Sequence, residues 1–239
     1  MTSRAVAEIL SAIRADALGE GGLPDRLVRM CARTLPVSGV GLALMTDDGP
    51  AGTVAVSDGG ALQLEELQFT LGHGPCVDAS RTGRPVLAPD LAATSPWTWP
   101  EFGAGADAAG LRAVFAFPLR IGGIRLGVLD LYRDVAGELS RKELADALTY
   151  ADAATQLLLD LQAQETARGV RAPHALPLLD DRAEVHQATG VVSVHAGVSL
   201  AQALALLRAR AYAEGRPIAD LARDVLDGVV HLGGKDDHD

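Results

Sequence analysis

The feature that most constrains the fold is a stretch between residues 180 and 230 that divides into three short helical segments. Gly197 and Gly215 interrupt this run, and Ser199 directly after the first break is a residue type that favours a new helix start. Apolar residues recur every three or four positions in each segment, so each predicted helix has one apolar stripe. Three short helices can cover three such stripes only by packing on one another. The sequence therefore predicts a small three-helix bundle over residues 178–232.

Two short motifs lie within this segment. Ala188-Thr189-Gly190 falls in the first predicted helix, Leu207-Arg208 followed by Ala211 falls in the second, and Pro217 opens the third. In this order and spacing the last quarter of the chain resembles the ANTAR module. The resemblance implies a domain that binds paired RNA hairpins in a nascent transcript, so that a terminator does not form. The ANTAR pattern usually has a basic residue where this chain has Thr189.

Charges decide how this segment could contact RNA. Residues 180–230 contain five arginines and seven acids, and the whole chain has a formal net charge of −10, which disfavours non-specific attraction to a polyanion. A local arginine cluster could still hold phosphates, and an aromatic ring could stack on unpaired bases. The candidate RNA-binding residues are Arg208, Arg210, Tyr212, Arg216 and Arg223. Alternatively, these arginines form surface ion pairs, and the bundle is a dimerisation or protein-partner module without RNA binding.

Before residue 165 the apolar pattern alternates between helical and strand periods. The expected helices cover residues 3–18, 23–35, 76–82 and 140–164, and the expected strands cover residues 40–44, 53–56, 85–88, 112–119 and 125–132. Residues 65–70 fit a strand or a short helix, a loop follows residue 88, and we expect a four-to-five-residue loop between the first two strands. Strands in hairpins flanked by helices predict an α+β fold, an antiparallel sheet with helices on one face and crossovers on the other.

Three segments of this region carry a resemblance to a known family through their order and spacing. They are GHGPCVDASRTGRPV, DLAATSPWTWPEF and LRAVFAFPLRIGGIRLGVLDLY. They resemble the GAF domain over about residues 20–165. The resemblance implies a sensor of a small molecule or redox state that dimerises through its first and last helices. We therefore expect a homodimeric, signal-responsive antitermination regulator with RNA and an unidentified small molecule as partners. The expected organisation is a GAF sensor domain (1–167), a linker (168–177), the ANTAR bundle (178–232) and a flexible tail (233–239).

Four residues are candidates for the ligand pocket of the sensor. Cys76 follows Gly74 and Pro75 at an expected helix start, where the thiol pKa could fall and make it a redox sensor or a ligand group. Alternatively, Cys76 only fills the core. Trp97, Trp99 and Phe102 lie in the stretch that roofs the pocket in GAF domains, so they either line a ligand site or form an apolar lid of the core. The candidate pocket residues are Cys76, Trp97, Trp99 and Phe102.

Other kinds of chemistry have little support. The motifs G-x-S-x-G, H-E-x-x-H and G-x-x-x-x-G-K-S/T do not occur, so we expect that the protein is not an enzyme. A GAF enzyme that uses Cys76 is a weaker alternative. His73 has no second ligand at metal spacing, so we expect no metal or other cofactor.

Two cysteines are too few for a disulfide framework. Residues 185–207 lack charges, but polar residues and a glycine break favour two helices of a bundle over a membrane span. A cytoplasmic location is therefore expected.

Overall fold

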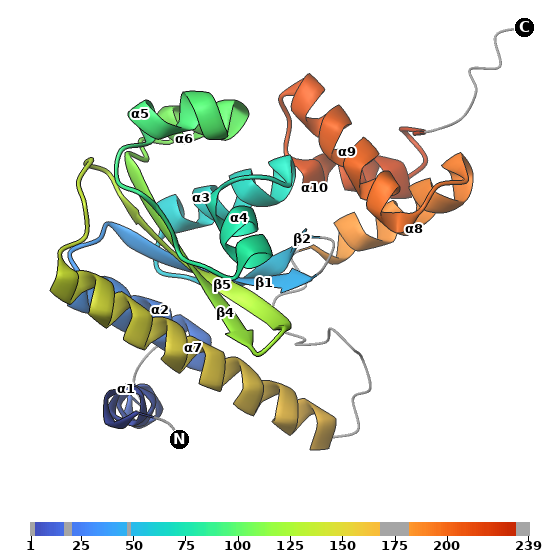
Figure 1. The fold of residues 1–239 in the computed structure, drawn as a ribbon. Helices are drawn as coiled ribbons and strands as arrows, with labels where there is room; N and C mark the ends of the chain where they lie inside the picture. Colours follow the sequence, from blue (N-terminus) through green and yellow to red (C-terminus); the bar gives the residue numbers. More distant parts are fainter. Residues whose placement is uncertain (1–2, 17–20, 47–48, 168–181, 233–239) are drawn as a thin grey trace, which may run out of the picture. The chain divides into compact units, whose positions relative to one another are not determined.

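The computed structural model describes residues 3–16, 21–46, 49–167 and 182–232, which form two compact units (Figure 1). Strands β1–β5 and helices α1–α7 belong to the first unit, and helices α8–α10 belong to the second. The predicted linker (168–177) and the predicted tail (233–239) lie outside the described residues, and so do the first four positions of the predicted bundle (178–181). Each unit is described by itself below.

One antiparallel sheet of five strands organises the first unit. Its strands are β1 (Gly39–Thr46), β2 (Gly49–Val56), β3 (Val86–Ala88), β4 (Ala113–Ile121) and β5 (Ile124–Arg133), in the order β2-β1-β5-β4-β3. The expected antiparallel sheet flanked by helices is confirmed. The expected four-to-five-residue loop between the first two strands is wrong, because only positions 47 and 48 separate β1 from β2.

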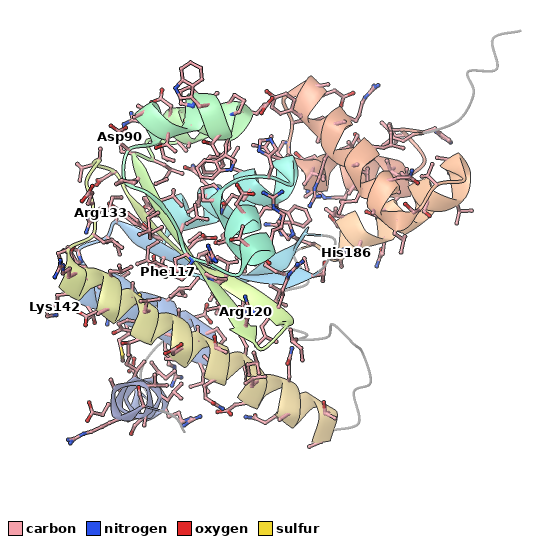
Figure 2. The ribbon with its side chains drawn as sticks, in the orientation of Figure 1. Asp90, Phe117, Arg120, Arg133, Lys142 and His186 are labelled. Atoms are coloured by element: carbon pink, nitrogen blue, oxygen red, sulfur yellow. The ribbon has the colours of Figure 1, made fainter. Side chains whose placement is uncertain are left out.

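Helices α2 (Leu23–Thr34) and α7 (Arg141–Ala167) cover one face of the sheet, and α1 (Arg4–Ala15) packs on these two helices (Figure 1). Their apolar stripes meet Leu129, Leu131 and the fully buried ring of Phe117, which Figure 2 labels. The predicted cap of α7 is confirmed, because Ser140 and Glu143 exchange two hydrogen bonds at its start. This face holds the larger of the apolar clusters described here.

The opposite face carries the crossovers as helices, namely α3 (Gly59–Leu71), α4 (Pro75–Thr82), α5 (Leu91–Thr98) and α6 (Pro100–Ala108) (Figure 1). The ambiguous residues 65–70 are helical and belong to α3. The loop expected after residue 88 is wrong, because Asp90 caps a new helix by accepting a hydrogen bond from the Ala93 amide over 3.2 Å. Pro96 lies inside that helix, which ends two residues later.

The second unit is the expected three-helix bundle of α8 (Ala183–Ala196), α9 (Leu200–Glu214) and α10 (Ile218–Leu226). Each helix contacts the other two. The capping box of Ser199 and Gln202 is present, and Gly197 and Gly215 adopt the left-handed conformation at the ends of α8 and α9, with φ of 64° and 62°. Buried residues of the three stripes are Val185, Ala188, Val192, Ala203, Leu207, Ala211, Ile218, Leu221, Ala222 and Val225.

Within the described residues, no single helix has the length and apolar composition needed to cross a bilayer. Helices α8 and α9 meet these criteria only when taken together, and they are bent by 107° at the break between them.

Candidate functional site

A buried polar group occupies the middle of the sheet, on the side that faces α3 and α4. Asp130 on β5 is 0% exposed and is flanked across the sheet by Gly41 on β1 and Ala116 on β4. Val128 packs with residues of α4, and side chains two apart on a strand share a face, so Asp130 points to the same layer. There Asp130 Oδ2 accepts a hydrogen bond of 3.2 Å from Gln68 Nε2. The Glu65 carboxyl group lies against Gly41, the residue beside Asp130 on the neighbouring strand. We call Glu65, Gln68 and Asp130 the acid cluster.

Local geometry explains how the acid cluster forms. Glu65 and Gln68 are three residues apart on α3, so both reach the sheet from one face of the helix. Gly41 makes the approach possible, since a Cβ at that position would overlap the Glu65 carboxyl group. Gln68 Oε1 accepts a hydrogen bond of 2.8 Å from the Cys76 amide at the start of α4. The acid cluster therefore connects the sheet to two helices.

Burial changes the ionisation of this region. It raises the pKa of Asp130 from 3.8 to about 7, against the lowering effect of the hydrogen bonds with Gln68 and Glu65. Burial also raises the pKa of the Cys76 thiol well above its ordinary value, and the neighbouring Asp130, Glu65 and Asp78 add to this rise. A backbone hydrogen bond from Val77 at the helix start lowers the pKa of Cys76, but burial is the larger effect, and the thiol stays protonated at neutral pH. This favours a packing role over a reactive thiolate.

Sequence reasoning missed the acid cluster. An acid within the apolar strand RLGVLDLY was a usable signal, because a charged residue is almost never fully buried without a partner. The partner could not be named, since residues 65–70 had not been assigned to a helix and lie far from residue 130 in the sequence. Only the fold brings Glu65 and Asp130 together.

The predicted pocket residues line neither of the two cavities described for the first unit. Trp99 is buried, donates from Nε1 to Asp78 Oδ2 over 2.9 Å and packs edge-to-face on the buried Phe102. Trp97 is 89% exposed. A cavity of about 370 Å³ lies between α5 and α6, and its lining includes none of Cys76, Trp97, Trp99 and Phe102. These four residues remain a proposal as ligand contacts, with Trp97 at the surface and the others in the core.

His73 has one acidic neighbour. Its Nε2 lies 3.5 Å from the Glu101 carboxylate, and both side chains are partly exposed. In the described ranges, no group of three or more His, Cys, Asp or Glu side chains is arranged to hold a metal ion.

Three arginines of the second unit are held by acids. Arg210 pairs with Glu214 on α9, and Arg216 in the following turn lies 3.7 Å from Glu214 and 2.7 Å from Asp224 on α10. These two arginines are therefore joined through one carboxylate. Arg223 lies in a separate pair of contacts, 3.0 Å from Glu184 on α8 and 2.8 Å from Asp220.

The remaining candidates, Arg208 and Tyr212, lie on the side of α9 opposite Arg210. Arg208 and Arg210 are about 200° apart around α9, whereas Tyr212, which is 56% exposed, lies one turn after Arg208 on the same side. Thr189 is buried, and its hydroxyl donates to the Val185 carbonyl over 2.7 Å. Arg210 and Arg216 thus form the only group that the described contacts of these five candidates bring together.

Comparisons with known proteins agree with this architecture. A family model described as GAF domain matches residues 23–159, and one described as ANTAR domain matches residues 178–226. A search of curated proteins gives no match. Among solved structures, a domain described as belonging to a two-component sensor histidine kinase protein from Sinorhizobium meliloti is 19% identical, with a TM-score of 0.51, over 64% of this chain and 99% of its own. This likeness supports the fold of the first unit.

Another similar structure is the GAF domain of a phosphoenolpyruvate-protein phosphotransferase from Coxiella burnetii. It is 19% identical with a TM-score of 0.47, over 71% of this chain and 100% of its own. The corresponding domain from Acinetobacter is 12% identical with a TM-score of 0.48, over 66% and 93%.

Proposed function

The chain belongs to the GAF domain family and continues into an ANTAR domain, and from this we propose that it is a cytoplasmic, signal-responsive transcription antitermination regulator. In this proposal the GAF domain senses a small molecule, and the ANTAR domain binds paired RNA hairpins in a nascent transcript. The buried cysteines support sensing by binding rather than by thiol chemistry, because burial raises the pKa of both Cys31 and Cys76. We propose no catalytic step.

The observation that carries the proposal is the agreement between the ANTAR match and the bundle. Residues 178–226 coincide with α8–α10, whose helix starts and stops follow the pattern of the sequence. The joined pair Arg210 and Arg216 supplies two guanidinium groups on one part of its surface. Exposed ion pairs contribute only about 0–1 kcal/mol each, so RNA phosphates can replace the carboxylates that hold these arginines.

We further propose that two copies act together through α1 and α7. Arg14 of α1 lies 2.7 Å from Asp160 of α7, and this contact helps to hold the two helices as one surface. A dimer would present two bundles to an RNA with two hairpins. Binding of the first hairpin would then raise the effective concentration of the second.

A filter-binding titration tests RNA binding. The full chain and the variant Arg208→Ala/Arg216→Ala are titrated with a two-hairpin RNA at low and at moderate salt. We expect weaker binding and a flatter salt dependence for the variant, because fewer phosphates are neutralised. The matched control is Arg4→Ala/Arg84→Ala, which removes two exposed arginines from the GAF domain. Equal affinity of both variants and the unmodified chain would exclude these arginines from the RNA site.

A second function is favoured by one observation. Arg210, Arg216 and Arg223 are paired with the four acids Glu184, Glu214, Asp220 and Asp224, so this network has no excess of positive charge. The bundle would then be a dimerisation or protein-partner module. Failure of the unmodified chain to bind any two-hairpin RNA even at low salt, with an intact fold, would favour this reading.

A further inference from the structure

The cavity of about 370 Å³ lies between α5 and α6, two neighbouring helices of the GAF domain (Figure 1). Its lining comes from these two helices and from positions 111 and 112, directly before β4. Pockets that bind small molecules have volumes of roughly 300–1,000 Å³, so this cavity falls at the lower end of that range. A ligand of this site is therefore a small molecule.

The sequences of the two helices create the cavity. A Cβ on Gly103 of α6 would overlap the Ser95 hydroxyl of α5, so the helices are in close contact at this point. Beside the contact, Ala92 of α5 and Ala104 of α6 line the cavity, and neither has a side chain that extends beyond Cβ. Space is left between the helices because these residues are too short to fill it.

Most of the lining is apolar. Leu91 and Leu111 are buried at its base, and Pro96 and Pro100 line it without offering a backbone N–H. The Ser95 hydroxyl donates to the Leu91 carbonyl, so its hydrogen is already used. This part of the cavity therefore suits an apolar group of a ligand.

A charged pair lines the same cavity. Arg112 Nη1 lies 2.8 Å from Asp107 Oδ1 and also donates to the carbonyl groups of Asp107 and Leu111. Among the described residues, every hydrogen bond of Arg112 runs through Nη1, so Nε and Nη2 keep their hydrogens for a ligand. The Asp107 side chain is 77% exposed, and within the same described ranges its Oδ2 accepts no hydrogen bond.

These two charges select a class of ligand. The Nε and Nη2 groups of Arg112 form a planar fork that matches a carboxylate. An anion bound there would be repelled by Asp107, and a cation bound to Asp107 would be repelled by Arg112. A molecule that carries a carboxylate and an ammonium group side by side avoids both repulsions. An α-amino acid carries both groups on one carbon atom.

We propose that the cavity between α5 and α6 binds a free α-amino acid with an apolar side chain. Its carboxylate accepts from Arg112, its ammonium group donates to Asp107, and its side chain contacts Leu91 and Leu111. The site is separate from the four pocket residues expected from the sequence. The inference names a ligand for the sensing role proposed above and rests on that role for its regulatory meaning, whereas binding itself is measured without RNA.

Isothermal titration calorimetry of the full chain tests binding, with L-leucine and L-phenylalanine as probes. We expect one saturable site per chain with a Kd of about 1 mM or below. L-Serine has the same two charged groups but no apolar side chain, and it should bind about tenfold more weakly. Equal binding of L-serine would refute the apolar side chain.

Absence of binding by both L-leucine and L-phenylalanine at about 10 mM, ten times the expected Kd, would overturn the proposal. This outcome is distinct from failure of the proposed function, which is measured by filter binding of RNA. A chain that binds L-leucine but no RNA would support the amino-acid site and contradict the antitermination role.

Two analogues of L-leucine test the charged pair. 4-Methylpentanoate lacks the ammonium group and 3-methylbutylamine lacks the carboxylate, so each should bind about tenfold more weakly than L-leucine. In Asp107→Asn we expect weaker binding of L-leucine but tighter binding of 4-methylpentanoate, because the repulsion is removed. The matched control Glu66→Gln, which removes an exposed acid of α3, should behave as the unmodified chain.

Arg112→Gln should have the opposite effect, with tighter binding of 3-methylbutylamine and weaker binding of L-leucine. Its control is Arg84→Gln, which removes an exposed arginine that does not line the cavity. A variant that merely disturbs the fold would weaken all probes alike. The same order of affinities in Asp107→Asn, Arg112→Gln and the unmodified chain would refute the roles of the two charges.

A cavity-filling variant tests the place of binding. Ala104→Leu puts a larger side chain into the cavity from an exposed position of α6, and Ala108→Leu makes the same change at an exposed position outside the lining. We expect loss of L-leucine binding in the first variant and unchanged binding in the second, with thermal unfolding as a check of the fold. Equal affinity of the two variants would place the amino acid elsewhere and refute the site.

Discussion

The guanidinium of Arg216 lies 2.7 Å from the carboxylate of Asp224, which joins the turn after α9 to the last turn of α10. The same carboxylate raises the pKa of Arg216, so the pair is electrostatically favourable. Both side chains are about one-third exposed, and solvent therefore screens this attraction. An RNA phosphate that approaches Arg216 must compete with Asp224.

If Arg216 belongs to the RNA site, removal of that competitor should strengthen binding. For Asp224→Asn we expect higher affinity for a two-hairpin RNA and a salt slope that steepens by about one, since one more phosphate contact is made. The control Asp227→Asn removes the same charge from the exposed end of α10. Filter binding over a salt series measures both quantities, and equal slopes for the two variants would exclude a contact by Arg216.

The bundle depends on the cap of α9. Ser199→Ala removes the oxygen that accepts from the Gln202 amide over 3.3 Å, and it should destabilise the start of α9 by about 1 kcal/mol. We expect hydrogen exchange of the first-turn amides to quicken by about fivefold, whereas Ser199→Thr should retain most of the protection. Equal exchange in the serine and alanine proteins would mean that the cap contributes nothing in solution.

Room for Glu65 is provided by Gly41. In Gly41→Ala the new methyl group would overlap the Glu65 carboxyl, so we expect a loss of about 1–3 kcal/mol in the free energy of unfolding of the GAF domain. Gly52→Ala on β2 is the matched control, because a Cβ there meets no atom within 4 Å. Denaturant unfolding followed by tryptophan fluorescence reports on this domain, since the two tryptophans, Trp97 and Trp99, both belong to it. Equal denaturant midpoints for the two variants would show that the Glu65 carboxyl group can approach the sheet without the space that Gly41 leaves.

The raised pKa of Asp130 gives a pH dependence of stability with a definite sign. Between about pH 4 and pH 7 the unfolded carboxyl group is ionised while the folded one keeps its proton, so unfolding releases a proton. The free energy of unfolding should therefore fall as pH rises through this window, by up to about 1.4 kcal/mol per pH unit, and should level off above it.

The measurement is a series of urea titrations in which the unmodified chain is compared with Glu65→Gln/Asp130→Asn and with Glu66→Gln. The difference between the unmodified chain and the double variant isolates this contribution from that of other acids. A difference that stays constant from pH 4 to pH 7 would contradict the raised pKa, and Glu66→Gln should follow the unmodified chain.

Much of the fold could be predicted because its determinants are local. Helices α8–α10 follow from glycine stops, one capping box and three apolar stripes, all of which are read within about fifteen residues. Strands β4 and β5 follow from two apolar runs around a glycine turn. Helix α5 was missed because Pro96 and two tryptophans suggested a loop, whereas the cap by Asp90 and the packing of Phe102 favour helices there.

The candidate sites were harder to predict because they depend on distant partners. Ion pairing of Arg223 with Glu184 requires the packing of α10 on α8, which no local pattern gives. The hydrogen bond between Gln68 and Asp130 requires the order of the strands and the orientation of α3. In Cys76 the helix start and the burial act on the thiol pKa in opposite directions, and only the fold reveals that burial is the larger effect.

The missing side chain at Gly41 has a consequence for evolution. A larger residue is compatible with that position only when the helix above it no longer brings a carboxyl group to the strand. Positions 41, 65 and 130 should therefore vary as a set among homologous chains, with glycine accompanying the two acids and bulkier residues accompanying their loss. Such covariation would identify, from alignments alone, which members of the family inherited the buried acids.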